Sequence, residues 1–210
     1  MTCFLRLTAL KAITLGAALS MTAGLALAGD NNVSADQILD ALQPKPLTRS
    51  LSAAPQVDPA VKAREIGFVQ TLRNRKTRSL SMGEREEIAE IASTKPNIDL
   101  DIQFDYNSAD ISASSLPSVQ ALGRALSNAN LRGSTFVVAG HTDAKGGAKY
   151  NKQLSLRRAQ AVKRFLVEKG MDAGRLDTVG YGSERLLAPD RPEDPNNRRV
   201  EIRDLGPRAQ

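Results

Sequence analysis

Two charged residues, Asp143 and Arg158, have the types and the spacing to recognise a small charged ligand. Arg158 belongs to a long helix that the hydrophobic spacing predicts over residues 149–169. With about 100° of rotation per residue, Arg158 falls about 40° from Leu154 and lies inside the apolar stripe, whereas Arg157 falls on the polar face. An unpaired guanidinium on an inward face costs several kcal/mol, so Arg158 requires a carboxylate partner.

Asp143 is the natural candidate within the chain, because it lies in the G-H-T-D-A-K-G segment (140–146) that precedes this helix. The pair can be structural, as a salt bridge that fixes the loop to the helix. Alternatively, Arg158 binds the carboxylate and Asp143 the ammonium of a zwitterionic ligand. Spacing alone favours the salt bridge. Asn151 precedes Arg158 by two helical turns, faces the same side, and can donate and accept hydrogen bonds.

The sequence lacks the residues that most catalytic mechanisms require. The single histidine, His141, and the single cysteine, Cys3, exclude a metal site built from several imidazole or thiolate ligands. The sequence has no G-x-S-x-G motif, no usable Cys–His pair and no phosphate-binding loop. We therefore expect no enzyme, no metal and no cofactor, and a structural role for His141 at the end of a strand.

The composition favours an anionic partner without identifying it. The 210 residues contain 29 Lys and Arg against 23 Asp and Glu, a net charge of +6. Aromatic residues make up only 4% and tryptophan is absent, which argues against a wide aromatic ligand cleft.

The first 28 residues predict a secretory signal peptide that is cleaved before Gly29. Arg6 and Lys11 precede a short apolar run, and Ala-Leu-Ala (26–28) provides small residues at the cleavage site. The alternative is a membrane anchor, but the apolar run is short for a bilayer of about 30 Å. Cys3 lies inside the signal, so lipidation at the cleavage site is not expected. The mature chain should have no transmembrane segment and should be extracytoplasmic, which makes nucleic acid an improbable partner.

Residues 29–96 are predicted to be a partly flexible, Pro- and Ala-containing N-terminal segment with two short helices. Each helix, 35–42 and 82–93, begins with a capping box, in which a serine precedes a Gln or Glu by three positions. The residues between them are predicted to be a linker. Four cations within residues 73–78 are either a solvated charge run, which we favour, or a patch for an anionic polymer.

Residues 97–206 predict a compact α+β domain, and residues 207–210 a tail. Hydrophobic periodicity gives the order β-α-β-α-β-β, a mixed four-stranded sheet with helices packed on one face. In the last strand, alternation directs Val200 and Ile202 to the core and Arg199, Glu201 and Arg203 to solvent.

Five segments of this domain resemble the C-terminal domain of the outer membrane protein A (OmpA) family, in order and spacing. They are I-x-F-x-x-N-S-A-D (102–110), G-H-T-D-x-x-G (140–146), N-x-x-L-S-x-x-R-A-x-x-V (151–162), G-Y-G (180–182) and N-R-R-V-E-I (197–202). The same domain occurs in peptidoglycan-associated lipoproteins and flagellar stator proteins. The resemblance implies non-covalent binding of peptidoglycan through the diaminopimelate of its stem peptide, in the periplasm of a Gram-negative envelope.

By the same resemblance, the ligand pair of the family falls on Asp143 and Arg158. Supporting contacts fall on Asn151, on Thr142, and on Asp105 and Asn107 in the 105–107 loop. This favours ligand binding over the salt bridge. The protein is then expected to be wall-associated and peripheral to the outer membrane. Two other classes stay open: an envelope scaffold whose residues 29–96 recruit another envelope protein, and a wall-active hydrolase, which the missing nucleophile argues against.

Overall fold

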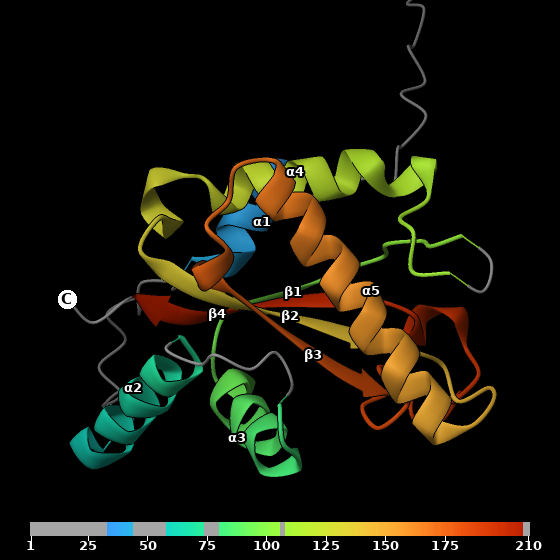
Figure 1. Cartoon of the computed structure of the whole chain (residues 1–210), viewed down its shortest axis with the longest axis horizontal. Helices are drawn as coiled ribbons and strands as arrows, with labels where there is room; N and C mark the ends of the chain where they lie inside the picture. Colours follow the sequence, from blue (N-terminus) through green and yellow to red (C-terminus); the bar gives the residue numbers. More distant parts are fainter. Residues whose placement is uncertain (1–32, 44–57, 74–79, 106–107, 208–210) are drawn as a thin grey trace, which may run out of the picture. The chain divides into compact units, whose positions relative to one another are not determined.

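The computed structural model describes residues 33–43, 58–73, 80–105 and 108–207. Its sheet has four strands in the order β1-β4-β2-β3, in which β4 is antiparallel to both of its neighbours and β2 is parallel to β3 (Figure 1). The strand bounds are β1 Asn97–Leu100, β2 Ser134–His141, β3 Leu176–Gly182 and β4 Val200–Pro207. The predicted α+β class with a mixed four-stranded sheet is confirmed.

Five α-helices accompany the sheet in the described part of the chain. They are α1 Ala35–Leu42, α2 Pro59–Arg73, α3 Met82–Ser93, α4 Leu116–Leu126 and α5 Ala148–Glu168. Both predicted capping boxes are present, with Ser34 and Gln37 at α1 and Ser81 and Glu84 at α3. From β1 onward, the order β1-α4-β2-α5-β3-β4 is the predicted one.

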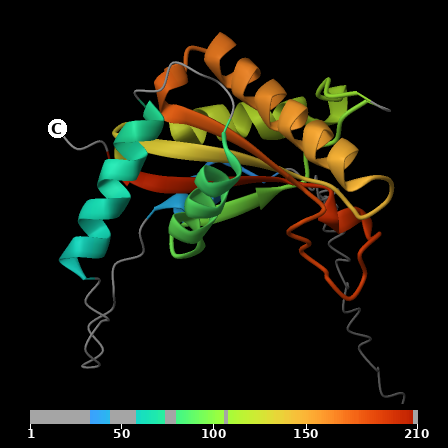
Figure 2. The same cartoon turned by 60° about the horizontal axis from the view of Figure 1, so that its bottom comes forward.

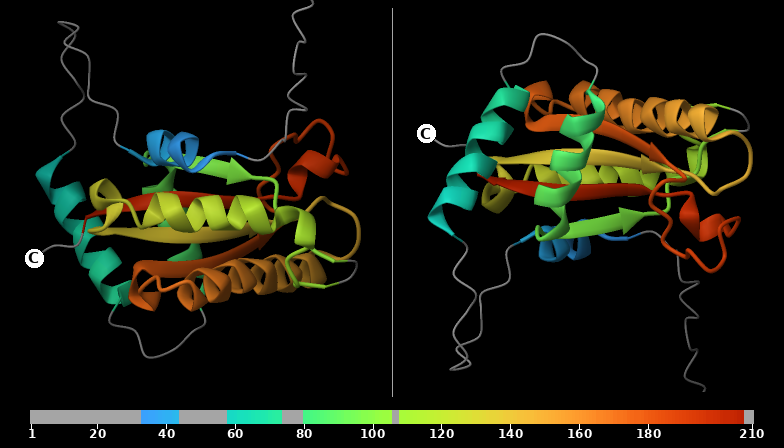
Figure 3. Two further views of the ribbon diagram at one scale, coloured as in Figure 1. Left: turned by 90° about the horizontal axis from the view of Figure 1, so that it is seen from above. Right: turned by 90° about the horizontal axis from the view of Figure 1, so that it is seen from below.

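One face of the sheet is covered by α1, α4 and α5 (Figure 3, left). Their apolar side chains form the larger core with residues of all four strands, including Ile38, Leu42, Leu122, Phe136, Val162, Leu166 and Ile202, each at most 1% exposed. Burial of this apolar surface is the main force that holds the helices to the sheet.

Helix α5 lies unusually close to the sheet, because glycines face it. A Cβ atom added at Gly140 on β2 would lie 2.1 Å from the Ser155 carbonyl oxygen. At Gly180 and Gly182 on β3, the nearest helix atoms would be 2.5 and 2.8 Å away. The glycines of the G-Y-G segment and of the strand before Asp143 therefore fix the distance of α5 from the sheet.

The second face is covered by α2 and α3, as Figure 2 and the right panel of Figure 3 show. Helix α2 corrects the prediction of a linker between the two capped helices. The Asp58 carboxylate accepts a hydrogen bond from the Ala60 amide at 2.8 Å, as an N-cap does, and Pro59 suits a first helical position. Val69 and Leu72 are buried with strand residues in the smaller core, so tertiary contact stabilises a helix with a weak amphipathic pattern.

The cover on this face also corrects the prediction that Glu201 faces solvent. Glu201 is only 4% exposed, and its carboxylate binds His141 Nε2 at 3.2 Å, the Arg203 guanidinium and the Asn97 amide. Burial alone would raise the pKa of Glu201, but the His141 hydrogen bond and the Arg203 charge lower it below its ordinary value. His141 also contacts the Arg185 carbonyl oxygen, so it has the expected structural position at the end of β2.

Several predictions fall outside the described residues: the signal peptide (1–28), most of the cation run (74–78) and Asn107. Among the residues that the structure does describe, no helix has the length and apolar character to cross a bilayer.

Candidate functional site

The loop between β2 and α5 presents Asp143 at the end of the sheet. Two backbone hydrogen bonds hold the loop, one from the Thr142 amide to the Gly182 carbonyl oxygen at 2.9 Å and one from the Ala144 amide to the Pro192 carbonyl oxygen at 2.8 Å. Asp143 is 7% exposed, and one of its carboxylate oxygens accepts the Lys145 amide at 3.2 Å. Bonds at the residues before and after Asp143 therefore fix the position of its carboxylate.

The cation that pairs with Asp143 is Arg198, so the structure does not contain the Asp143–Arg158 salt bridge that spacing alone favoured. Arg198 Nη1 lies 2.8 Å from Asp143 Oδ2, and its side chain is 46% exposed. The contact spans 55 residues. It forms because the chain between β3 and β4 folds back over the 142–147 loop, which no local pattern indicates.

Asn197, the first residue of the N-R-R segment, holds this returning chain. It is fully buried, its amide donates to the Arg191 carbonyl oxygen at 2.9 Å, and its side-chain oxygen accepts the Ala188 amide at 2.9 Å. Asn197 thus directs Arg198 towards Asp143.

Arg158 is half-buried and has no carboxylate within salt-bridge distance among the described residues. Its guanidinium lies over the Phe104 ring at 4.9 Å, and its Nε donates a long hydrogen bond of 3.5 Å to the Ser108 carbonyl oxygen. Burial and the nearby charge of Arg198 lower the pKa of Arg158, while Asp143 partly opposes them. Arg157 is exposed, so the predicted division between these two arginines is confirmed.

Asn151 and Thr142 are both buried beside Asp143, each 3% exposed. The side-chain Nδ2 of Asn151 donates to the backbone carbonyl oxygens of Asp143 at 3.3 Å and Lys145 at 2.8 Å. Asn151 therefore ties α5 to the loop. The Thr142 hydroxyl is buried and has no hydrogen-bond partner among the residues described here.

Asp105 is exposed at the start of the loop that continues to Ser108 and Asp110. The Asp105 amide donates to the Asp110 carbonyl oxygen, and the Ser108 amide to the Asp105 carbonyl oxygen, both at 3.0 Å. This turn brings Ser108 to Arg158, and in the described part of the chain the Asp105 side chain has no hydrogen bond or ion pair with the Asp143 loop. Asn107 is not among the described residues.

The site combines one carboxylate with two guanidinium groups. The sequence did not assign Arg198 to the site, and it contained Phe104 and Ser108 only as members of the I-x-F-x-x-N-S-A-D segment. The N-R-R segment was the one signal for Arg198. The net charge of the three ionised groups is positive, so the arrangement suits a ligand that has a carboxylate for Arg158 and a polar or cationic group for Asp143.

Comparison with known proteins matches the part of the chain that contains these residues to one family model. Residues 103–199 match the model of the OmpA family. The chain is 36% identical over 102 residues to the peptidoglycan-associated lipoprotein of Pseudomonas aeruginosa. This alignment covers 48% of this chain and 59% of that protein. It is 38% identical over 106 residues to the outer membrane porin F of Pseudomonas fluorescens, covering 50% of this chain and 32% of that protein.

Two solved structures resemble this chain over half its length. The OmpA-like domain of FopA1 from Francisella tularensis has a TM-score of 0.45 and 28% identity, covering 50% of this chain and 70% of that one. The cell wall anchor of the T6SS from Pseudomonas aeruginosa has a TM-score of 0.40 and 30% identity, covering 50% of this chain and 76% of that one. The chain spans less than two thirds of the first two curated relatives, 59% and 60% of their lengths.

Proposed function

We propose that this chain, which belongs to the OmpA family through residues 103–199, binds peptidoglycan non-covalently through the diaminopimelate of the stem peptide and so anchors or organises the cell envelope. The names of two relatives, a peptidoglycan-associated lipoprotein and a cell wall anchor, support the polymer as the partner.

The observation that carries the proposal is the state of Arg158. Its guanidinium is half-buried, has no carboxylate within salt-bridge distance in the described part of the chain, and has a pKa lowered by desolvation and by Arg198. A ligand carboxylate that binds here supplies the missing charge and can accept two parallel hydrogen bonds from the guanidinium. The Phe104 ring beneath the guanidinium limits the positions that it can adopt.

Asp143 provides the second half of the recognition. The side-chain end of meso-diaminopimelate has an ammonium and a carboxylate on one carbon atom, so it requires an anion beside a cation. Arg198 occupies only one oxygen of Asp143 at 2.8 Å, and the other oxygen accepts the Lys145 amide. A carboxylate has about four acceptor directions, so Asp143 can still accept from a ligand ammonium, while Arg198 adds positive potential for the ligand carboxylate.

We further propose a periplasmic, wall-associated location, peripheral to the outer membrane, for the chain that remains after removal of residues 1–28. The alternative function is an envelope scaffold, in which residues 29–96 recruit another envelope protein and wall binding is secondary. In the described residues, α2 and α3 use their buried sides to cover the sheet, so only their outward sides are available to such a partner.

Isothermal titration of the purified chain with two muropeptides tests the proposal. One muropeptide has diaminopimelate and the other has lysine at the same position, and lysine lacks only the second carboxylate. We expect the diaminopimelate peptide to bind at least about thirtyfold more tightly, because lysine leaves Arg158 without its counter-charge. Equal affinity for the two peptides would contradict the assignment of Arg158 to that carboxylate.

A further inference from the structure

The Arg198 side chain occupies the carboxylate that a ligand ammonium requires. Its Nη1 lies 2.8 Å from Asp143 Oδ2, while Oδ1 of the same carboxylate accepts the Lys145 amide. The Asp143 side chain is buried, whereas the Arg198 side chain is half-exposed. A half-exposed cation loses little packing when it leaves its partner, so Arg198 can move while Asp143 stays in place.

The backbone of Arg198 is fixed beside the site, so any such movement is confined to the side chain. Its amide donates to the Pro195 carbonyl oxygen at 2.9 Å. The residue before it, Asn197, is fully buried, and the carbonyl oxygen of the residue after it, Arg199, accepts the His141 amide at 3.0 Å. The guanidinium therefore turns about a fixed point next to Asp143.

Arg198 and Arg158 lie close enough for each to affect the charge of the other. Burial lowers the pKa of Arg158, the charge of Arg198 lowers it further, and the charge of Asp143 opposes both. Asp143 forms its ion pair with Arg198, and Arg158 forms none within the described residues. Two guanidinium groups thus share one carboxylate, and a second carboxylate from a ligand would relieve their repulsion.

This sharing sets different conditions for different ligands. A ligand with an ammonium alone must displace Arg198 from Asp143, and it leaves both guanidinium groups without an anion. A ligand with a carboxylate alone can bind Arg158, but it makes no use of Asp143. A ligand with both groups on one carbon atom gives its ammonium to Asp143 and its carboxylate to Arg198 and Arg158, so every charge keeps a partner.

We propose that Arg198 determines the specificity of this site by exchanging partners. Its ion pair with Asp143 excludes ligands that have only an ammonium, and it opens for a ligand whose carboxylate replaces Asp143 as the partner of Arg198. This inference rests on the proposed function, since it concerns the same ligand. It assigns part of the selection for diaminopimelate over lysine to Arg198, in addition to the part that Arg158 supplies.

Isothermal titration of the parent chain and Arg198→Gln with the diaminopimelate and lysine muropeptides tests the exchange. The lysine peptide should bind Arg198→Gln about fivefold or more tightly than the parent, because Asp143 is then open to its ammonium. The diaminopimelate peptide should bind no more tightly than to the parent, because it loses one charge-assisted contact. The ratio of the two affinities should therefore fall about tenfold.

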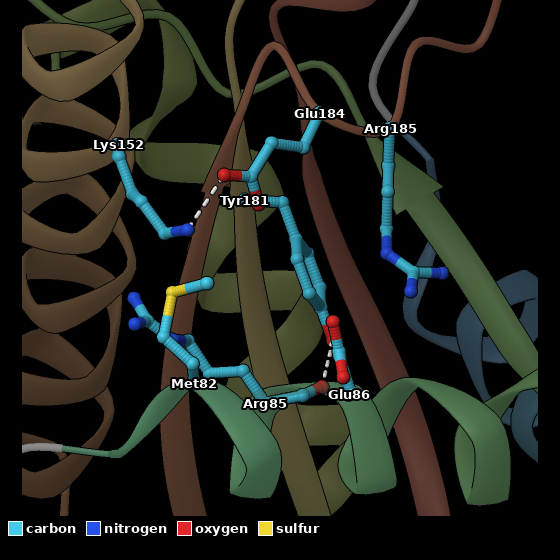
Figure 4. Close-up of a pocket in the computed structure, with 7 residues that line it drawn as sticks. All are labelled: Met82, Arg85, Glu86, Lys152, Tyr181, Glu184 and Arg185. Atoms are coloured by element: carbon cyan, nitrogen blue, oxygen red, sulfur yellow. Dashed lines mark hydrogen bonds and ion pairs between the residues drawn. The ribbon is translucent and has the colours of Figure 1, made fainter.

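Arg185→Gln is the matched control, because it removes the same charge from the same connection between β3 and β4. Arg185 is exposed, and its guanidinium lies over the Tyr181 ring at 4.8 Å, away from Asp143. It belongs to a charged cavity on the second face of the sheet (Figure 4). The residues that line this cavity are Met82, Arg85, Glu86, Lys152, Tyr181, Glu184 and Arg185. Arg185→Gln should bind both peptides like the parent.

Arg198→Lys is the second variant, because it keeps a cation that can pair with Asp143. It should bind the lysine peptide as weakly as the parent does. Melting temperatures of all variants should stay close to that of the parent, since both arginines are at least half-exposed.

Three results would overturn the exchange while leaving the proposed function intact. They are an unchanged affinity ratio in Arg198→Gln, an equal loss of affinity for both peptides in that variant, and a gain for the lysine peptide that Arg185→Gln reproduces. A parent chain that binds neither peptide would instead contradict the proposed function, and the exchange with it.

Discussion

The two faces of the sheet are built by different means. The face under α1, α4 and α5 is apolar, with a large core and a helix seated directly on glycines of β2 and β3. The face under α2 and α3 has a smaller core and a polar cluster in which the buried His141 and Glu201 meet the partly exposed Arg203. The first face positions the loop that carries Asp143, and the second closes a charged cavity at the end of β3. Helices α1, α2 and α3 of the N-terminal segment are therefore part of the folded unit.

Gly140→Ala should have the largest effect on stability, because α5 lies closest to the first face of the sheet at Gly140. The added Cβ would lie 2.1 Å from a carbonyl oxygen of α5, so helix or strand must move. We expect the free energy of unfolding to fall by at least about 3 kcal/mol in urea denaturation. Gly133→Ala is the control, since its added Cβ meets nothing within 4 Å, and it should change stability little. Similar losses in the two variants would show that α5 is not tightly seated.

Glu201→Gln breaks the polar cluster of the second face. Because the folded-state pKa of Glu201 is lowered, its charge contributes stability above the pKa of the unfolded chain, and this contribution is lost as the pH falls through the folded-state pKa. We therefore expect the variant to lose about 2 kcal/mol of unfolding free energy at neutral pH and to match the parent chain in acid. Urea denaturation at neutral and acid pH measures this difference. If the unfolding free energy of the variant stays lower in acid, the loss comes from disturbed packing and not from the missing charge.

Removing the N-cap of one helix on each face gives the smallest expected losses of stability and compares the two faces directly. Ser34→Ala removes the capping bond of α1 on the first face, and Ser81→Ala removes that of α3 on the second. Each should lower the unfolding free energy by about 1 kcal/mol, since both serines complete a capping box. Ser112→Ala is the control, because Ser112 makes no side-chain cap bond and its hydroxyl has only an exposed hydrogen bond with Ser114. A loss at Ser34 without one at Ser81 would show that α3 unfolds separately from the sheet.

Features that depend on neighbouring residues could be predicted from the sequence. The spacing along α5 and the serines before α1 and α3 contain their own period or caps, and the structure has helices there. The inward position of Arg158 follows from the same helical spacing.

Features that depend on distant residues could not be predicted in the same way. Helix α2 has a weak amphipathic pattern and is stabilised by the sheet, and Glu201 is buried because helices from another part of the chain cover it. The Asp143–Arg198 pair joins residues 55 positions apart through a folded-back loop. In each case the decisive partner lies far along the chain, where local periodicity carries no information about it.

The central claim is that Arg158, not its neighbour, binds the wall polymer together with Asp143. Co-sedimentation of full-length variants with purified sacculi, alongside their melting temperatures, tests it most directly. Arg158→Gln and Asp143→Asn should stay folded and lose binding by roughly thirty- to several-thousand-fold, equivalent to about 2–5 kcal/mol, whereas Arg157→Gln should sediment like the parent chain. Folded Arg158→Gln and Asp143→Asn proteins that still sediment with sacculi would contradict the claim.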